Sequence, residues 1–275
     1  MLVSVLSFSV THVCVKYLSH IPFFELVFFR SLISFVLTFW AIKRSKLSLW
    51  GKNRKGLFFR GFAGTLALCG YFYTIQEIPL ATAVKIQYLS PMTTLIIASL
   101  FLKEKALPIQ WFFFLFAFIG VLFVKGLDHS VALVPFGIGL LSAVGSGIAY
   151  NLVRHLRKSE HELVIVFYFP LVTLPLLFPF TWIYWVTPNG EDWGFIILLG
   201  LFTQIAQVFM TKSYKMEQAS KVSIVNYLGI AIAALVGWFG FSEEVTMTSL
   251  FGMAVIFLSV IGNTWIGLKT EKRRV

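Results

Sequence analysis

The chain has 275 residues, of which 58% are hydrophobic and only 13% are charged, and its formal net charge is +11. A water-soluble domain carries roughly a quarter charged residues, so a chain with about half that proportion cannot cover its surface for water. The composition therefore excludes a soluble globular protein and predicts an all-α integral membrane protein.

Apolar stretches of near-spanning length recur along the whole chain, and about 20 residues are needed to cross a bilayer. Proline, glycine and asparagine separate them, as in Pro188-Asn189-Gly190. We predict ten transmembrane helices, at about residues 2–19, 23–42, 57–76, 81–102, 109–124, 133–153, 163–186, 193–212, 220–241 and 249–268.

The charged residues of the predicted loops fall into two sets. Most of the 23 lysines and arginines lie at alternate loops, from residues 43–60 to a basic tail at residues 269–275. The other loops hold Glu77, Asp128, Glu191, Asp192, Glu243 and Glu244. Because cytoplasmic loops are rich in lysine and arginine, we expect a multi-pass protein of the inner or plasma membrane with both termini inside. The basic clusters are short and lie at helix ends, which argues against a nucleic-acid partner.

Two passages, beginning at Ile78 and at Met216, repeat one another. Matching residues are Val84 and Val222, Ile86 and Ile224, Tyr88 and Tyr227, and Glu104 and Glu243. The chain then divides into residues 1–126 and 131–268, with five predicted helices each. An odd number of helices makes the second half enter the membrane with the opposite orientation. Such an inverted repeat has its pseudo-two-fold axis in the membrane plane and a site near the midplane.

The passage YFYTIQEIPLATAVKIQYLSPMTTLIIASLFLKEK, residues 71–105, resembles the fourth-helix region of the EamA branch of the drug/metabolite transporter superfamily. The family's small helix start falls on Ala81-Thr82, its mid-helix proline on Pro91 and its acidic residue on Glu104. Residues 25–30 resemble the family's second-helix opening, and Arg60-Gly61 resembles its third-helix start.

This resemblance covers essentially the whole chain. It implies ten helices in two inverted five-helix repeats, and secondary transport, commonly the export of amino acids or other small metabolites. The second repeat departs from the pattern, because Gly229 stands where the proline would be. We therefore expect the two halves to bend differently.

Polar residues inside the predicted helices are candidates for a substrate site, because ionisable groups in a bilayer usually face a cavity or a partner. His12 and Lys16 lie one turn apart on the first helix, and Lys16 could either line a cavity or extend to the membrane interface. Histidine titrates near neutral pH, which makes His12 the candidate for proton coupling. Arg30 is expected to hold helices together, with an anchor for a substrate carboxylate as the alternative.

The fourth helix and its repeat partner carry further candidates. Pro91 frees the Gln87 carbonyl in mid-membrane, where protein or water must satisfy it. The two helices would build opposite walls of one site, unless their tyrosines and amides only bond neighbouring helices. The predicted substrate-binding residues are His12, Lys16, Tyr71, Lys85, Gln87, Tyr88, Tyr150, Asn151, Gln204, Gln207, Asn226 and Tyr227. The predicted structural residues are Arg30, Pro91, Glu104, Gly229 and Glu243.

The sequence contains no catalytic constellation, metal-ligand spacing or phosphate-binding loop, so we expect neither an enzyme nor a cofactor. We predict a secondary active transporter of a small amino-acid-like or otherwise amphiphilic metabolite, working by alternating access with export favoured. The alternatives are a lipid-carrier flippase and an intramembrane enzyme. The expected partners are a small-molecule substrate, membrane lipid and a coupled proton, and a monomer and a homodimer both remain open.

Overall fold

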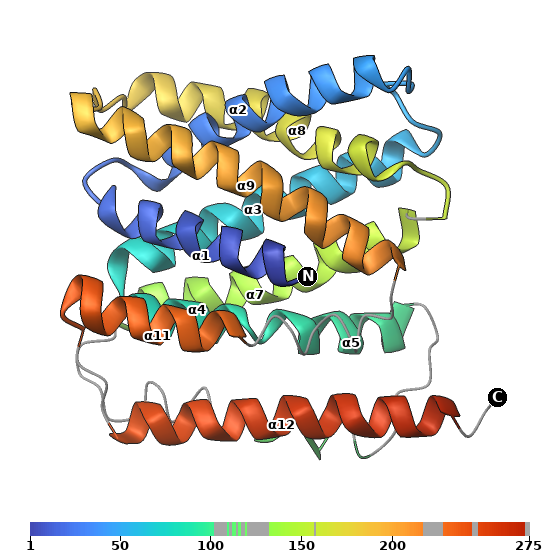
Figure 1. Cartoon of the computed structure of the whole chain (residues 1–275), viewed down its shortest axis with the longest axis vertical. Coiled ribbons are helices and arrows are strands. Elements are labelled where there is room, and N and C mark those ends of the chain that lie inside the picture. Colours follow the sequence, from blue (N-terminus) through green and yellow to red (C-terminus); the bar gives the residue numbers. More distant parts are fainter. Residues whose placement is uncertain are drawn as a thin grey trace.

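The computed structural model contains helices and turns, and no strand, over the residues that it describes. These are residues 1–101, 132–156, 158–216, 228–243 and 247–272, with a few positions between 109 and 119. The helices are α1 Leu2–Tyr17, α2 Phe23–Arg44, α3 Arg54–Glu77, α4 Leu80–Gln87, α5 Ser90–Phe101, α7 Leu133–Leu156, α8 Glu162–Ile183, α9 Gly190–Met216, α11 Leu228–Phe241 and α12 Met247–Lys272. They run roughly alongside one another, with α2 and α8 at one edge of the bundle and α12 at the other (Figure 1).

Four helical stretches are long and apolar enough to cross a membrane, namely Phe23–Arg44, Leu133–Leu156, Glu162–Ile183 and Gly190–Ser213. Shorter apolar helices include Leu2–Tyr17 and Leu228–Phe241. Large apolar side chains such as Leu141 and Trp182 lie exposed on the outside of the bundle. An apolar exterior of this kind suits lipid, and the protein is an integral membrane protein.

The stretch predicted as a single helix over residues 81–102 forms two helices, α4 and α5, with a turn at Tyr88 and Leu89 between them. Pro91 has no N–H to donate to the Gln87 carbonyl, so the helical ladder stops there. In the turn the backbone hydrogen bonds span three residues instead of four, as where Leu89 N–H donates to the Ile86 carbonyl at 3.0 Å. The predicted bend at Pro91 is thus a complete interruption of the helix.

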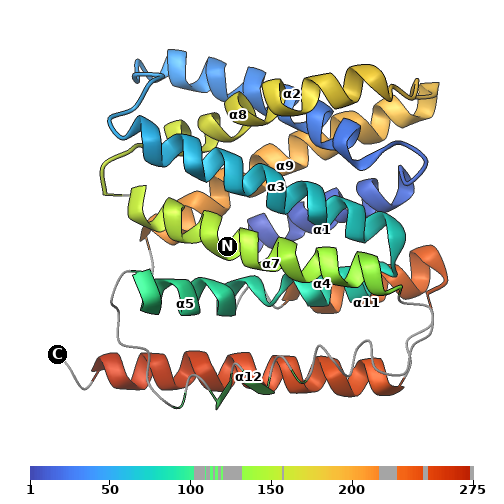
Figure 2. The same ribbon diagram turned by 180° about the vertical axis from the view of Figure 1, so that it is seen from behind.

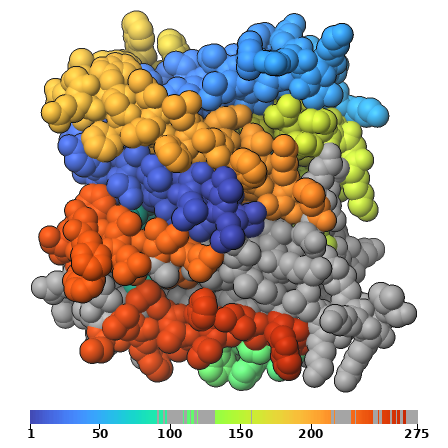
Figure 3. Space-filling model, in the orientation of Figure 1, coloured from blue at the N-terminus to red at the C-terminus, as the bar shows by residue number. Residues whose placement is uncertain are grey.

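Helices from before residue 127 pack against helices from after residue 131. Between α1 and α9, Ser4 Oγ donates to the Ala206 carbonyl at 2.9 Å. Between α3 and α7, which lie side by side in Figure 2, Ser142 Oγ donates to the Ala67 carbonyl at 2.6 Å. On the face drawn in Figure 3, the side chains of α9 and α1 are in continuous contact. The core is therefore built jointly by the two parts of the chain.

The other predicted spans agree with the observed helices to within a few residues, except where residues lie outside the described part of the chain. Those exceptions are most of the predicted span at 109–124, and residues 220–227 of the span at 220–241. The helix α12 extends from Met247 to Lys272, a little beyond both predicted ends.

Candidate functional site

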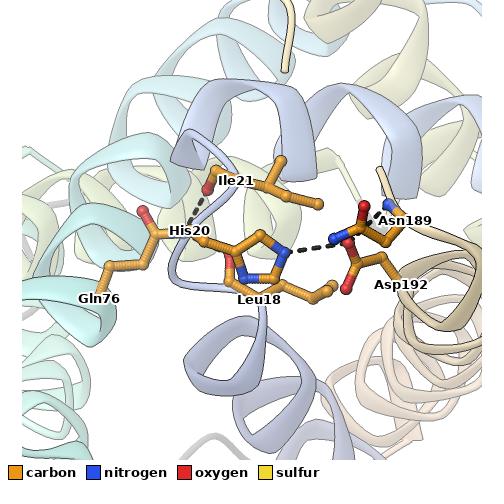
Figure 4. Close-up of polar contacts among 6 residues, drawn as sticks. All are labelled: Leu18, His20, Ile21, Gln76, Asn189 and Asp192. Atoms are coloured by element: carbon orange, nitrogen blue, oxygen red, sulfur yellow. Dashed lines mark hydrogen bonds and ion pairs between the residues drawn. The ribbon is translucent and has the colours of Figure 1, made fainter. Parts of the chain in front are cut away.

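At one end of the bundle, which we call the His20 end, polar contacts join the α1–α2 turn to α3 and to the start of α9 (Figure 4). His20 Nε2 lies 3.0 Å from Asp192 Oδ2, and that oxygen also accepts a hydrogen bond from Asn189 N–H at 2.8 Å. Gln76 Nε2 donates to the Ile21 carbonyl at 2.8 Å. The His20–Asp192 contact joins the first part of the chain to the second, and the other two contacts order the loops on either side of it.

At the opposite end, which we call the Glu160 end, a carboxylate joins the two parts of the chain. Glu160 Oε1 accepts hydrogen bonds from the backbone N–H groups of Lys52 at 2.7 Å and Asn53 at 2.5 Å. Asn53 is the N-cap of α3, and its own side chain accepts from Gly56 N–H. Glu160, from the part of the chain after residue 131, thus binds backbone groups from the part before residue 127.

Inside the bundle is a cavity of about 140 Å³. The described helices that line it belong to both parts of the chain: α1, α2, α3, the α4–α5 turn, α7, α8 and α9. Its polar lining residues are Ser9, Thr11, His12, Arg30, Arg60, Tyr71, Gln87, Tyr88, Ser90, Ser146, Tyr150 and Gln207. Apolar and aromatic side chains, such as Phe8, Phe72 and Phe169, complete the wall.

A histidine and a tyrosine form one contact across this cavity. His12 Nε2 of α1 lies 3.2 Å from Tyr71 Oη of α3, and either atom can donate, depending on the tautomer of the ring. The two rings are nearly perpendicular, with centroids 5.2 Å apart. The pair places a group that can exchange a proton on the cavity wall.

The amide of Gln87, the last residue of α4, is bonded on both sides to α7. Its Nε2 donates to Ser146 Oγ at 2.7 Å, and its Oε1 accepts from Ser142 Oγ at 3.2 Å. The serines thus fix the end of α4 just before the turn that carries Tyr88. Serine and glycine in α7 permit this close approach, as small residues do between membrane helices.

Tyr88 reaches across to α11, where Gly229 admits its hydroxyl. A Cβ at Gly229 would lie only 2.0 Å from Tyr88 Oη. The sequence predicts that the two halves bend differently, because Gly229 stands where the proline would be. The structure gives Gly229 a steric role as well, because any side chain there would displace Tyr88.

Arg30 of α2 and Arg60 of α3 are both buried, at 1% and 4% exposure, and both line the cavity. Their guanidinium carbons lie 5.4 Å and 5.1 Å from the centroid of the Phe169 ring. Arg30 also stacks on Phe72 at 5.6 Å. The sequence predicts that Arg30 holds helices together through carbonyls or a carboxylate. Within the described residues its side chain packs on these rings and binds no carboxylate.

Sequence reasoning missed Arg60. We placed it near the start of the third helix, counted it with the basic residues of that membrane side and did not name it as a site residue. The helix α3 begins at Arg54, so Arg60 lies almost two turns inside it. A signal was present in the sequence, since Arg60, Gly64, Ala67 and Tyr71 follow a helical spacing that puts them on one face. All four line the cavity.

Several predicted site residues lie away from the described cavity lining and bond neighbouring helices. Lys16 Nζ donates to the Ile78 carbonyl at 2.8 Å. Asn151 Nδ2 donates to the Thr94 carbonyl at 2.8 Å. Gln204 Nε2 donates to Thr38 Oγ1 at 2.8 Å. Lys16, expected either to line a cavity or to extend to the membrane interface, thus bonds the linker between α3 and α4, and the two amides bond neighbouring helices.

The remaining predicted residues lie in different places. Tyr150 and Gln207 line the cavity with His12, Tyr71, Gln87 and Tyr88, whereas Lys85 is buried in α4 outside the described lining. Glu243 accepts hydrogen bonds at the start of α4. Asn226, Tyr227 and Glu104 lie outside the described residues, and for Pro91 the structure describes only the backbone.

Metal ligands do not gather anywhere in the described part of the chain, where no group of three His, Cys, Asp or Glu side chains could hold an ion. Cys14 and Cys69 are free thiols. The chemistry of the cavity is therefore that of hydrogen bonds, cations and aromatic rings.

A solved crystal structure superposes on 98% of this chain and 96% of its own with a TM-score of 0.71. Because the two share 16% sequence identity, this is a likeness of fold alone.

Closer relatives are transporters. A pseudopaline exporter of Pseudomonas aeruginosa is 33% identical over 93% of this chain and 91% of its own. An S-adenosylmethionine uptake transporter of Rickettsia felis is 27% identical over 93% and 87%, and solute carrier family 35 member G1 of Mus musculus is 29% identical over 94% and 75%. The model of the EamA-like transporter family matches residues 1–126 and 135–265. The chain therefore belongs to the EamA-like transporter family of the drug/metabolite transporter superfamily, and it is a transmembrane transporter.

Proposed function

We propose that this protein is a secondary active transporter that carries a small organic metabolite by alternating access, with export as the favoured direction. The observation that carries the proposal is the cavity lined by described helices of both parts of the chain. A site shared in this way is opened by moving one part of the chain against the other. Polar side chains in a membrane interior raise the free energy of the folded protein unless a solute, water or another polar group binds them.

The membrane arrangement in this proposal has ten helices in two inverted halves, residues 1–126 and 131–268. The two stretches matched by the family model support this division. The pairing of α1 with α9 and of α3 with α7 supports it as well, since each pair joins opposite halves. Following the distribution of basic residues, the Glu160 end and both termini lie in the cytoplasm, and the His20 end faces outward across the inner or plasma membrane.

Alternating access in this proposal requires the contacts at the His20 end and at the Glu160 end to separate in turn. The cavity of about 140 Å³ is smaller than the roughly 300–1,000 Å³ of most small-molecule sites, so helices must separate to admit a metabolite. Among the described residues, hydrogen bonds of Asp192 and Glu160 and buried apolar side chains such as Ile21 and Leu57 join the helices at the two ends. Opening one end would have to separate these contacts while the other end stays packed.

Within the cavity, we assign substrate contact to His12, Tyr71, Gln87, Tyr88, Tyr150 and Gln207. Asn226 and Tyr227 remain candidates from the second repeat. The relatives include both an exporter and an uptake transporter, so the direction of transport must be measured on this protein. A proton gradient acting through His12 is the proposed driving force.

Transport by purified protein in proteoliposomes tests this function. Uptake of a labelled panel of amino acids, organic acids, amines and nucleosides should be measured with and without an imposed pH gradient. Tyr71→Ala, in the cavity, should abolish uptake of the active solute. Tyr184→Ala changes an exposed tyrosine beyond the end of α8 and should leave it unchanged. Transport that is insensitive to Tyr71→Ala would contradict the proposed site.

A further inference from the structure

The two arginines of the cavity have N–H groups without a hydrogen-bond acceptor, and a positive charge without a partner carboxylate, among the described residues. The Nε atom of Arg30 and the Nε and Nη1 atoms of Arg60 are buried and donate to no described atom. Both side chains are more than nine-tenths buried, and both line the cavity. Arginine keeps its charge at neutral pH, so the cavity wall carries two cations.

Four carboxylates of the described residues have partners outside the cavity, and only Oε1 of Glu25 among their oxygens is buried without one. Glu25 Oε2 accepts from Val186 N–H, Asp192 meets His20, Glu160 binds Lys52 and Asn53, and Glu243 binds Leu80. None of these acids is among the described residues of the cavity lining. An anion that enters the cavity would therefore find two cations without a competing carboxylate on the described wall.

The two cations are grouped around one aromatic ring of the cavity wall. Both guanidinium groups pack on the Phe169 ring within 5.4 Å of its centroid, so they are less than twice that distance apart. A Cβ at Gly64 would lie 3.1 Å from two atoms of this ring, so glycine leaves the ring room to sit between α3 and α8. The ring restrains both planar groups, and a restrained guanidinium fork matches the two oxygens of a carboxylate.

The side chain of Gln207 on the cavity wall indicates that the ligand also carries a hydrogen-bond donor. Gln207 of α9 lines the cavity, and its Oε1 atom is buried with no hydrogen-bond donor among the described residues. A carbonyl oxygen can only accept, so it requires an N–H or O–H group from the ligand. The wall thus offers donors for an anion at the arginines and an acceptor at Gln207.

We propose that the substrate is a small organic anion whose carboxylate binds Arg30 and Arg60, and whose amino or hydroxyl group donates to Gln207. This assignment rests on the proposed transport function and names the substrate class of the same site. Amino dicarboxylic acids and hydroxy acids have both features. Simple amines, sugars and organic cations lack the carboxylate.

Binding to the purified, full-length protein in detergent tests the assignment directly. Glutamate, malate and succinate should be titrated calorimetrically at constant ionic strength, beside choline, glucose and glycerol phosphate. We expect glutamate and malate to bind, succinate to bind more weakly because it has no donor for Gln207, and choline and glucose not to bind. Binding of glycerol phosphate without binding of any carboxylate would overturn the proposal.

Matched arginine variants separate a site from a general charge effect. Arg30→Gln and Arg60→Gln should each weaken carboxylate binding about 10- to 100-fold, as expected for the loss of a hydrogen bond to a charged group. Arg44→Gln on α2 and Arg54→Gln on α3 are the controls, because these exposed arginines stack on Trp40 and Trp50 outside the cavity. The controls should keep the affinity of the unchanged protein.

Lysine variants serve where a glutamine variant does not fold, since Arg30→Lys and Arg60→Lys keep the charge and lose the planar fork. We expect them to bind carboxylates more weakly than the unchanged protein, and unchanged affinity in both would overturn the assignment. If proteoliposomes carry a cation or a neutral solute and both lysine variants keep that flux, the substrate class is wrong while transport stands. If carboxylates bind as expected and no solute crosses, the binding site stands and the transport proposal fails.

Discussion

Glu243, which follows α11, caps the start of α4 on the other part of the chain. Its Oε1 atom accepts a hydrogen bond from Leu80 N–H at 2.6 Å, and its Oε2 atom accepts one from Ala81 N–H at 3.3 Å. The first N–H groups of a helix have no partners within it, and the N-cap residue Pro79 forms no side-chain cap bond. The carboxylate thus satisfies both groups and complements the positive end of the helix dipole.

Glu243→Ala should lower the free energy of unfolding by about 1–2 kcal/mol, because it removes a charged cap from a short helix. Glu243→Gln should lower it less, since an amide oxygen can still accept one of the two bonds. Thermal unfolding in detergent measures both. Glu191→Gln, at an exposed position in the first turn of α9, is the control, and an equal loss there would show that the charge acts non-specifically.

Gly229→Ala should impair transport through Tyr88. The new Cβ would lie 2.0 Å from Tyr88 Oη, and the tip of the tyrosine would move before either helix does. Displacing a substrate-contacting group by about 1 Å can reduce a rate about 100-fold, and we expect a loss of about tenfold or more in uptake rate. The measurement is initial uptake into proteoliposomes.

A second substitution checks this mechanism. Tyr88→Phe removes the hydroxyl and leaves a nearest ring atom at 3.1 Å, so the double variant should recover part of the uptake that Gly229→Ala loses. Gly137→Ala is the matched control, because nothing lies within 4 Å of its Cβ position. A double variant no better than Gly229→Ala alone would place the defect in α11 instead.

The positions of the helices could be predicted from the sequence because their cause is local. Apolar runs of near-spanning length mark them, and Pro22, Pro79 and Gly190 stand at or next to their starts. Pro91 likewise predicted the disturbance in the fourth span. The extent of this disturbance was not predictable. The missing N–H of a proline can produce either a kink or a complete interruption of the helix, and the contacts of neighbouring helices decide between them. Here Ser142 and Ser146 of α7 hold the end of α4.

The membership of the site could be predicted only in part, because it depends on which helices meet. His12, Tyr71 and Gln207 stood out as polar residues in apolar spans, and they share the cavity. Lys16 has the same signature, but its amine reaches the carbonyl of Ile78, 62 residues away in the sequence. Arg60 was placed near the start of the third helix and counted with the basic residues Arg54 and Lys55 of that membrane side, so it was not named as a site residue. Its charge alone did not tell that its side chain reaches the cavity.

Cysteine labelling tests the orientation in the membrane. Lys52→Cys lies at the Glu160 end and Asn189→Cys at the His20 end, in a background with Cys14 and Cys69 replaced by alanine. A membrane-impermeant maleimide added to intact cells should label Asn189→Cys and not Lys52→Cys, and a tag fused at Arg274 should be cytoplasmic. The reverse pattern would overturn the assignment based on loop charge.

His12→Gln should separate coupling from binding. The imidazole lies on the cavity wall with Nε2 at 3.2 Å from Tyr71 Oη, so it can exchange a proton with whatever occupies the cavity. Glutamine keeps a hydrogen-bonding group of similar length and cannot titrate. We expect uptake driven by a pH gradient to fall about tenfold or more, in the range that positioned proton transfer contributes to reactions, while counterflow exchange of substrate persists.

His155→Gln, at an exposed position near the end of α7, should change neither rate. Equal loss of both activities would make His12 a binding residue, and full retention of both would remove it from the mechanism.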